Sequence, residues 1–233
     1  MSERAGRCCI CSQIRGDRTA DLISLSIGEQ RYVRRVPLET AVCAVIPSLG
    51  PIAPGHSLVC PKRHVRSMAR LESDEAREAW EFRAVACEVL RRMTSAPVHI
   101  FEHGAARCGG RTLCTVDHAH LHLLPADVDV VDRLASELPW RGVEPCLEAI
   151  AAAVGDGEYL YYETPDGRSF VLPAAEVRCE SQYLRRVFAE ALGLRRHWNW
   201  RRAMALDEVE RTFAAFAGAA READPHSLRT LQM

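Results

Sequence analysis

The sequence lacks any long apolar run. None of its 233 residues belongs to a segment that approaches the ~20 consecutive apolar residues needed to cross a bilayer. The first residues, MSERAGRCCICSQIRGD, also lack the apolar core of a signal peptide. We therefore expect a cytoplasmic protein with no membrane partner.

The chain also has almost no net charge. It has 30 Lys and Arg residues and 31 Asp and Glu residues, which gives a formal net charge of −1. Such a balance creates no general field for nucleic acid, so we expect no nucleic-acid partner. Hydrophobic residues make up 48% of the chain and charged residues 26%, which is typical of a water-soluble globular protein.

Internal repeats and low-complexity tracts are absent as well, so each element is predicted from its own pattern. Residues 1–20 read as a loop. A long helix is expected over 72–93, and strands are expected at 22–28, 31–37, 40–49, 56–61, 97–104 and 117–125. Loops rather than crossover helices join most of these strands, which predicts an α+β fold with a mostly antiparallel sheet.

The composition changes after Pro125, and we expect two parts: a catalytic domain over 1–130 and a C-terminal α/β extension over 131–233. The extension should pack on the first part or cap it. Its predicted elements are a helix over 131–155, a hairpin over 157–173, a short helix over 180–193 and a last helix over 207–224.

Cysteine is abundant, at ten residues. A cytoplasmic setting argues against a disulfide framework. Cys8 and Cys11 have the C-x-x-C spacing of a metal-binding knuckle, with Cys9 as a spare thiol. The pair alone is a weak signal, because a closed zinc site needs two more ligands. The alternative is a buried or reducible cluster of cysteines.

Three histidines alternate in the segment DHAHLHLLP. On a strand, His118, His120 and His122 would share one face, and Ala119 and Leu121 would face the core. Two kinds of chemistry suit such a line. The imidazoles could hold a metal, or the middle one could be a nucleophile that its neighbours orient and assist. A hydrogen-bonded structural role is the plain alternative for any one of them.

The segment HAHLHLLP resembles the motif of the histidine triad (HIT) superfamily, His-φ-His-φ-His-φ-φ with φ apolar. Upstream, PGHSLVCPKRH resembles that family's GH-x-L-V-I-P-K-x-H segment. The resemblance covers roughly residues 8–127 and implies a HIT-like fold that acts on nucleotides. It implies His120 as the nucleophile, His122 as a phosphate-binding residue that favours water as acceptor, and His56 as a further pocket histidine.

The resemblance also bears on substrate binding. It implies that Thr115 contacts the phosphate. The acidic residue that usually binds ribose is missing from AVIPSLGPIAPGH, where Ser48 is the nearest polar substitute. Glu102 stands where an Asn is usual, and either reads a cationic substrate group or lies in a solvated loop. Arg185 or Arg186 is a candidate phosphate clamp, with a solvated helix face as the alternative.

Family members that carry a C-x-x-C pair complete a zinc site with two histidines. The matching positions here are His64 and His118, so the resemblance implies a Zn²⁺ ion held by Cys8, Cys11, His64 and His118. A closed set of four ligands makes such a site structural rather than catalytic.

Three functions stay open. The first is a hydrolase or transferase that acts on the α-phosphate of a dinucleoside polyphosphate, nucleotide anhydride or phosphoramidate through a nucleotidyl-His120 intermediate. The second is a nucleotide-binding or interaction module without catalysis. The third is a hydrolase with its metal in the triad, which the short chain disfavours because such motifs belong to barrels of ~250 residues. A small nucleotide is the expected partner, and a homodimer stays open because the extension could block the interface of small family members.

Overall fold

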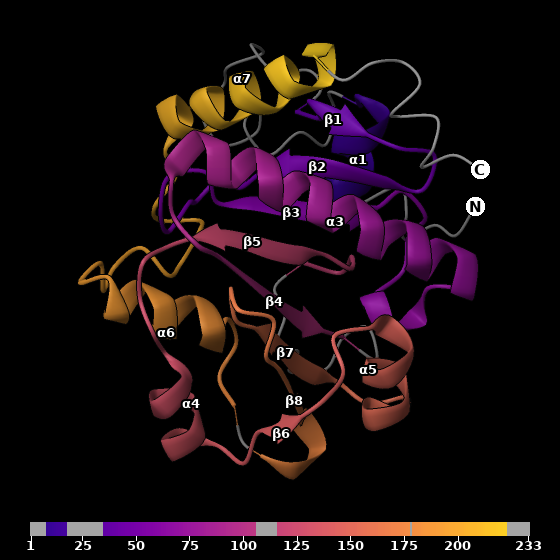
Figure 1. Cartoon of the computed structure of the whole chain (residues 1–233), viewed down its shortest axis with the longest axis vertical. Helices are drawn as coiled ribbons and strands as arrows, with labels where there is room; N and C mark the ends of the chain where they lie inside the picture. Colours follow the sequence, from indigo (N-terminus) through magenta and orange to yellow (C-terminus); the bar gives the residue numbers. More distant parts are fainter. Residues whose placement is uncertain (1–7, 18–34, 106–115, 178, 223–233) are drawn as a thin grey trace.

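A computed structural model describes residues 8–17, 35–105, 116–177 and 179–222 (Figure 1). Its strands are β1 (Leu38–Glu39), β2 (Cys43–Pro47), β3 (Ser57–Pro61), β4 (Val98–Gly104), β5 (Leu121–Pro125), β6 (Arg141–Gly142), β7 (Tyr159–Glu163) and β8 (Ser169–Pro173). Its helices are α1 (Cys9–Arg15), α3 (Ser73–Thr94), α4 (Val131–Glu137), α5 (Leu147–Val154), α6 (Tyr183–Ala191) and α7 (Leu206–Glu222), with 3-10 turns η3 (Met68–Arg70) and η4 (Ala174–Glu176). None of these helices is long and apolar enough to span a bilayer.

The strands form one sheet of eight, in the order β1-β2-β3-β5-β4-β7-β8-β6. Every neighbouring pair is antiparallel, which confirms the predicted α+β class. The extension joins this sheet directly, because β7 pairs with β4 and places Ile100 opposite Glu163. The division into two domains at residue 130 stays a prediction.

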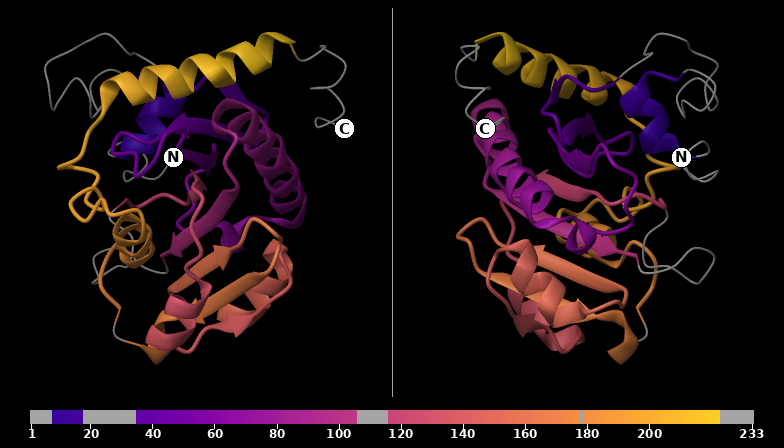
Figure 2. Two further views of the ribbon diagram at one scale, coloured as in Figure 1. Left: turned by 60° about the vertical axis from the view of Figure 1, so that its left-hand side comes forward. Right: turned by 90° about the vertical axis from the view of Figure 1, so that its right-hand side faces the viewer.

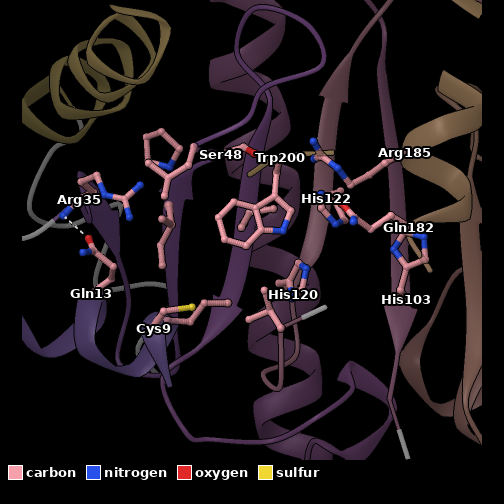
Figure 3. A pocket seen from close by; sticks show the side chains of 16 residues that line it. Cys9, Gln13, Arg35, Ser48, His103, His120, His122, Gln182, Arg185 and Trp200 are labelled. Atoms are coloured by element: carbon pink, nitrogen blue, oxygen red, sulfur yellow. Dashed lines mark hydrogen bonds between the residues drawn. The ribbon is translucent and has the colours of Figure 1, made fainter. Parts of the chain in front are cut away.

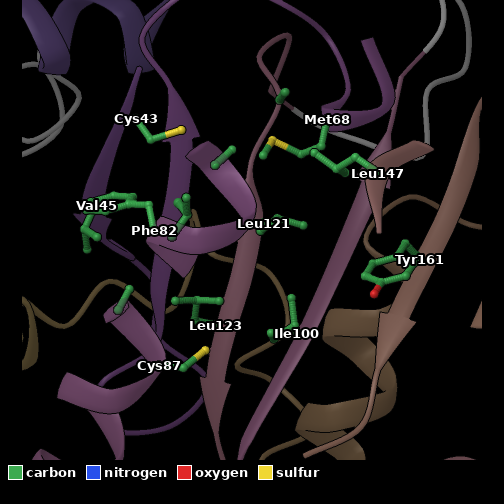
Figure 4. Close-up of a cluster of buried hydrophobic side chains, with 14 of the residues drawn as sticks. Cys43, Val45, Met68, Phe82, Cys87, Ile100, Leu121, Leu123, Leu147 and Tyr161 are labelled. Carbon is green, nitrogen blue, oxygen red and sulfur yellow. The ribbon is translucent and has the colours of Figure 1, made fainter. Parts of the chain in front are cut away.

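One face of the sheet packs under α3, with α5 and α7 beside that helix (Figures 1 and 2). Alternate strand residues, among them Ile100, Leu121 and Leu123, meet Phe82 and Leu90 of α3 in the main core (Figure 4). The side chains between them on the strands therefore project to the opposite face.

That opposite face carries two separate hydrophobic clusters. In the first, Ile10 of α1 packs against β2 and β3. In the second, α4 and α6 pack against β4, β7 and β8, with Phe101 and Phe188 in contact. The two clusters leave the middle of the sheet, over β3, β5 and β4, for the polar site described below.

The structure differs from the predictions in several places. Residues 9–15 form α1 instead of a loop. The triad strand starts only at Leu121, because the Ala119 N–H donates to the Val65 carbonyl instead of a strand partner. The helix expected over 131–155 is split into α4 and α5, since Pro139 and Pro145 lie between them and proline has no N–H to donate. The strand expected at 22–28 and most of that at 31–37 lie outside the described residues, and the described residues 35–37 are not part of a strand, since β1 begins at Leu38.

Candidate active site and metal centre

A pocket opens on the second face of the sheet, between α1 and α6 (Figure 3). It holds about 680 Å³ of empty space, the open mouth included. No Asp or Glu of the described residues lines it, so its polar wall is neutral or cationic. The polar side chains are Gln13, Arg35, Ser48, His103, His120, His122, Gln182 and Arg185.

His120 has a defined tautomer. Its Nδ1 lies 2.7 Å from the carbonyl oxygen of His118, which can only accept, so Nδ1 carries the proton. The lone pair is then on Nε2. Burial lowers the pKa of His120 to about 4, so the ring is neutral at pH 7. A neutral, anchored imidazole with a free Nε2 is the form that can attack an electrophilic centre.

A hydrogen-bonded relay sets the tautomer of His122 in the same way. The Ile52 N–H donates to His56 Nδ1 at 3.1 Å, so His56 carries its proton on Nε2. That N–H then donates to His122 Nδ1 at 3.0 Å. His122 is left with a proton on Nε2, and burial holds the pKa of both rings well below the usual range. His122 therefore offers a donor beside the lone pair of His120, with their ring centroids 4.8 Å apart.

His103 of β4 and Arg185 of α6 form the pocket wall beside helix α6. The Leu184 N–H donates to His103 Nε2 at 3.3 Å, and burial lowers the pKa of His103 to about 3. Arg185 is 3% exposed and donates to the carbonyls of Trp198 at 2.8 Å and Gly50 at 2.6 Å. Burial lowers the pKa of Arg185 to about 9, and no described carboxylate forms an ion pair with its guanidinium. A buried cation of this kind suits an anionic ligand.

A second cluster lies at the N-terminal end of the triad. The four candidate ligand atoms, from Cys8, Cys11, His64 and His118, all lie within 4.8 Å of one another. His118 Nδ1 is 3.4 Å from each sulfur atom and 3.3 Å from His64 Nδ1. Its Nε2–H donates to the Pro61 carbonyl at 2.8 Å, which leaves Nδ1 free to bind an ion. The cluster can hold a metal ion, and Cys9 faces the pocket instead.

Comparison with known proteins finds a family match over part of the chain. Residues 33–129 match the family model described as HIT domain. The similarity to a HIT domain applies to this span and not to the chain as a whole. Over 102 residues the chain is 28% identical to the bis(5'-adenosyl)-triphosphatase of Dictyostelium discoideum. The aligned stretch makes up 42% of this chain and 66% of that relative. The chain thus spans slightly less than two thirds of the curated relative that it matches.

Two solved structures are similar to parts of this chain. The NitFhit protein of C. elegans is 26% identical, with 40% of this chain and 22% of that chain covered and a TM-score of 0.36. A hypothetical histidine triad nucleotide-binding protein from Sulfolobus tokodaii is 13% identical, with 81% and 84% covered and a TM-score of 0.43. These scores are low, so the fold described above rests on the strand pairing of this chain.

The fold brings most of the predicted residues together, both inside and outside the span that matches the HIT domain. His120, His122, Ser48 and Arg185 line one pocket, and His56 lies directly behind His122. The four predicted metal ligands form the neighbouring cluster. Thr115 lies outside the described residues.

Glu102 is not brought to the pocket. On β4 it shares the face of Ile100, toward α3, while Phe101 and His103 face the site. Its Oε1 accepts from the Met68 N–H at 2.8 Å, and its Oε2 accepts from the Tyr159 hydroxyl. Burial raises the pKa of Glu102 to about 7. We therefore leave Glu102 out of the proposed substrate site.

Other pocket residues have no signal in the sequence. Cys9 and Gln13 reach the pocket from a helix that the pattern did not predict. Trp200 lines the pocket because its backbone lies against Gly50, where an added Cβ would be 2.4 Å from the Trp200 Cα. Gln182 lies at the start of α6, outside the span that matches the HIT domain.

Proposed function

We propose that this protein is a nucleotide hydrolase that cleaves a nucleoside 5′-phosphate conjugate at the α-phosphorus through a nucleotidyl-His120 intermediate. The observation that carries the proposal is the pair of tautomers at the pocket: a lone pair on His120 Nε2 beside an N–H on His122 Nε2. Such a pair suits attack on phosphorus by one ring while the other binds a phosphoryl oxygen.

The reaction has two steps. His120 Nε2 attacks the α-phosphorus, a P–N bond forms, and the bond from phosphorus to the leaving group breaks with its electron pair. His122 Nε2–H donates to a phosphoryl oxygen and stabilises the charge that develops there. Water then attacks the phosphorus, the P–N bond breaks, and the nucleoside monophosphate leaves. His120 recovers its lone pair, and the proton released by the water goes to solvent.

Three further side chains complete the proposed substrate site. Arg185 supplies a buried cation for phosphoryl oxygens, Ser48 supplies a hydroxyl for the nucleoside, and Thr115 stays a proposed phosphate contact. The named activity of the Dictyostelium relative makes a dinucleoside triphosphate the first conjugate to test.

We propose Zn²⁺ as the ion of the cysteine and histidine cluster. Tetrahedral zinc with bonds of about 2.0–2.3 Å separates its ligand atoms by roughly 3.3–3.8 Å. The separations of 3.3 and 3.4 Å between these atoms agree with that geometry. Four protein ligands leave no open position, so the ion would be structural: it would join α1, which forms one pocket wall, to the segment that carries His120.

Cytoplasmic location and homodimerisation stay predictions. Both edges of β4 pair with strands of its own chain, β5 and β7. Among the strands of the described residues, the short β1 and β6 lie at the outer edges of the sheet. A dimer that extends the sheet would therefore have to use one of those two strands.

The test is a turnover assay with dinucleoside polyphosphates, nucleotide anhydrides and nucleoside phosphoramidates. His120→Ala should lower kcat/KM by about 10³-fold or more without a lower unfolding temperature. His197→Ala changes an exposed histidine and should leave turnover unaltered. Acid-quenched wild-type protein should gain the mass of a nucleotidyl group, and His120→Ala should not. Binding without turnover or adduct would instead support a nucleotide-binding module.

A further inference from the structure

One histidine of the pocket wall, His103 of β4, lies outside the triad and has no part in the proposed reaction. In the register of β4 and β5, Phe101 pairs with His122. Continuing that register brings His103 to His120, because the two strands run in opposite directions. The rings of both residues pack against the ring of His122, with centroid distances of 5.9 Å and 4.8 Å. His103 is therefore a close neighbour of the proposed nucleophile across two strands.

A hydrogen bond from the extension fixes the tautomer of His103. The Leu184 N–H, in the first turn of α6, donates to His103 Nε2 at 3.3 Å. Nε2 must therefore carry the lone pair, and Nδ1 carries the proton of the neutral ring. The ring is neutral at pH 7, because burial lowers the pKa of His103 to about 3. His103 thus has one occupied acceptor and one N–H donor.

The Nδ1–H of His103 is available to a ligand. No group of the described residues accepts a hydrogen bond from it, although the residue as a whole is buried. The Nδ1 atom itself is not fully enclosed, so its N–H opens into the pocket that His103 lines. The contact with α6 explains why Nε2 is an acceptor, but it gives the Nδ1–H no partner. A pocket donor of this kind suits an acceptor atom of a bound molecule.

Two N–H donors from different strands therefore accompany the lone pair of His120 Nε2 (Figure 3). His122 Nε2–H comes from the triad segment itself, and His103 Nδ1–H comes from β4. An α-phosphorus that His120 attacks carries two non-bridging oxygens, and these oxygens carry the charge of the transition state. Donors that are fixed before the reaction stabilise such charge, because they need no reorganisation as it develops. The number of donors matches the number of oxygens.

We propose that His103 is a further catalytic residue, whose Nδ1–H binds one non-bridging oxygen of the α-phosphate while His122 binds the other. The inference rests on the proposed nucleotidyl transfer to His120. His103 donates a hydrogen bond and transfers no proton, so it assists both the attack by His120 and the later attack by water. Its tautomer depends on Leu184, which lies outside the span that matches the HIT domain. The extension therefore orients a catalytic donor of the triad pocket.

Two substitutions separate the roles of the two ring nitrogens. Asn carries its amide nitrogen on Cγ, as His carries Nδ1, so His103→Asn keeps the pocket donor and loses the acceptor for Leu184. Gln carries its amide one bond further out, so His103→Gln keeps that acceptor and loses the donor at the Nδ1 position. With a dinucleoside triphosphate, His103→Gln should lower kcat/KM about 10- to 100-fold, the range for one hydrogen bond to a charged group. His103→Asn should stay within about fivefold of the wild type but unfold at a lower temperature.

His99 provides the matched control. It is buried on the same face of β4, and both of its nitrogens have partners, the Tyr162 hydroxyl and the Ala126 carbonyl. His99→Gln should therefore lower the unfolding temperature and leave kcat/KM unaltered. Rapid-quench mass spectrometry adds a second readout: in His103→Gln, the formation of the nucleotidyl adduct and its hydrolysis should slow by similar factors. Slowing of neither step would contradict a donor to the phosphoryl group.

The outcomes separate this inference from the proposed function. Equal activity of His103→Asn and His103→Gln, or a loss confined to His103→Asn, would mean that His103 only supports α6, and it would overturn the inference. If the wild-type protein turns over no conjugate and forms no adduct, the proposed function fails instead. The donor is then measured by calorimetric titration with adenosine 5′-monophosphate, which should bind His103→Gln about tenfold more weakly than His103→Asn. Equal binding to both variants, or binding to neither them nor the wild type, would overturn the inference as well.

Discussion

Replacing Glu102 with Gln should stabilise the protein in alkaline solution and change its stability little in acid. Burial raises the pKa of this carboxyl from 4.5 to about 7, so the unfolded chain loses the proton at a lower pH than the folded one. A raised acid pKa means that stability falls as pH rises from the unfolded value through the folded one. At pH 8 the wild type should lose about 3 kcal/mol relative to a side chain that never ionises, and at pH 5 about 1 kcal/mol.

The pH dependence of the difference is the diagnostic quantity. Gln keeps the bond from the Met68 N–H but alters the one with the Tyr159 hydroxyl, which costs about 1 kcal/mol at either pH. The advantage of Glu102→Gln should therefore grow by about 2 kcal/mol between pH 5 and pH 8. Urea unfolding at both values, at equal metal content, measures it. Glu81→Gln, an exposed change on α3, should stay within about 0.5 kcal/mol at both.

A difference that does not vary with pH would refute the reasoning about Glu102. A second measurement tests its location. Because its side chain faces α3 and bonds to Met68 and Tyr159, Glu102→Gln should keep kcat/KM within about threefold. A large loss of activity with normal stability would mean that the carboxyl serves the pocket after all.

Two further predictions concern the metal cluster and the packing of β4. Cys11→Ser should contain no bound zinc by elemental analysis and should unfold at a lower temperature than the wild type. Cys9→Ser, which changes a pocket residue, should keep the ion. Equal zinc contents in the two variants would contradict the proposed ligand set. Gly104→Ala places a Cβ 2.2 Å from the Tyr159 ring and should cost about 1–3 kcal/mol in urea unfolding. Gly218→Ala meets nothing within 4 Å in α7 and should be neutral or stabilising, so equal effects of the two changes would refute the packing argument.

The predictions that succeeded rest on short-range patterns. The alternation of His120 and His122 with Leu121 and Leu123 describes two faces of one segment, and the leucines do lie in the core while the histidines face the pocket. The hairpin at 157–173 was readable because Gly167 adopts the positive φ that its turn requires. The helix expected over 131–155 failed because its alanine-rich composition outweighed two prolines that should have ended it.

Glu102 shows the limit of prediction from local sequence patterns. The motif resemblance placed it beside the substrate, but one step of strand alternation sends its side chain to the α3 face, where Tyr159 of the extension meets it. Pairing between β4 and β7 joins residues more than fifty positions apart, and no local pattern predicts the register of that pairing.

The chain's own residue order determines the chemistry that is available: the triad, the cysteine pair and the histidine after Gly55 can all be named from the printed sequence. Tertiary structure alone decides how that chemistry is arranged. The tautomer of His122 depends on the Ile52 N–H through His56, and the cationic wall depends on α6 packing against β4 from the far end of the chain. Hydrogen bonds and burial set those properties, and both depend on contacts between segments that the sequence keeps apart.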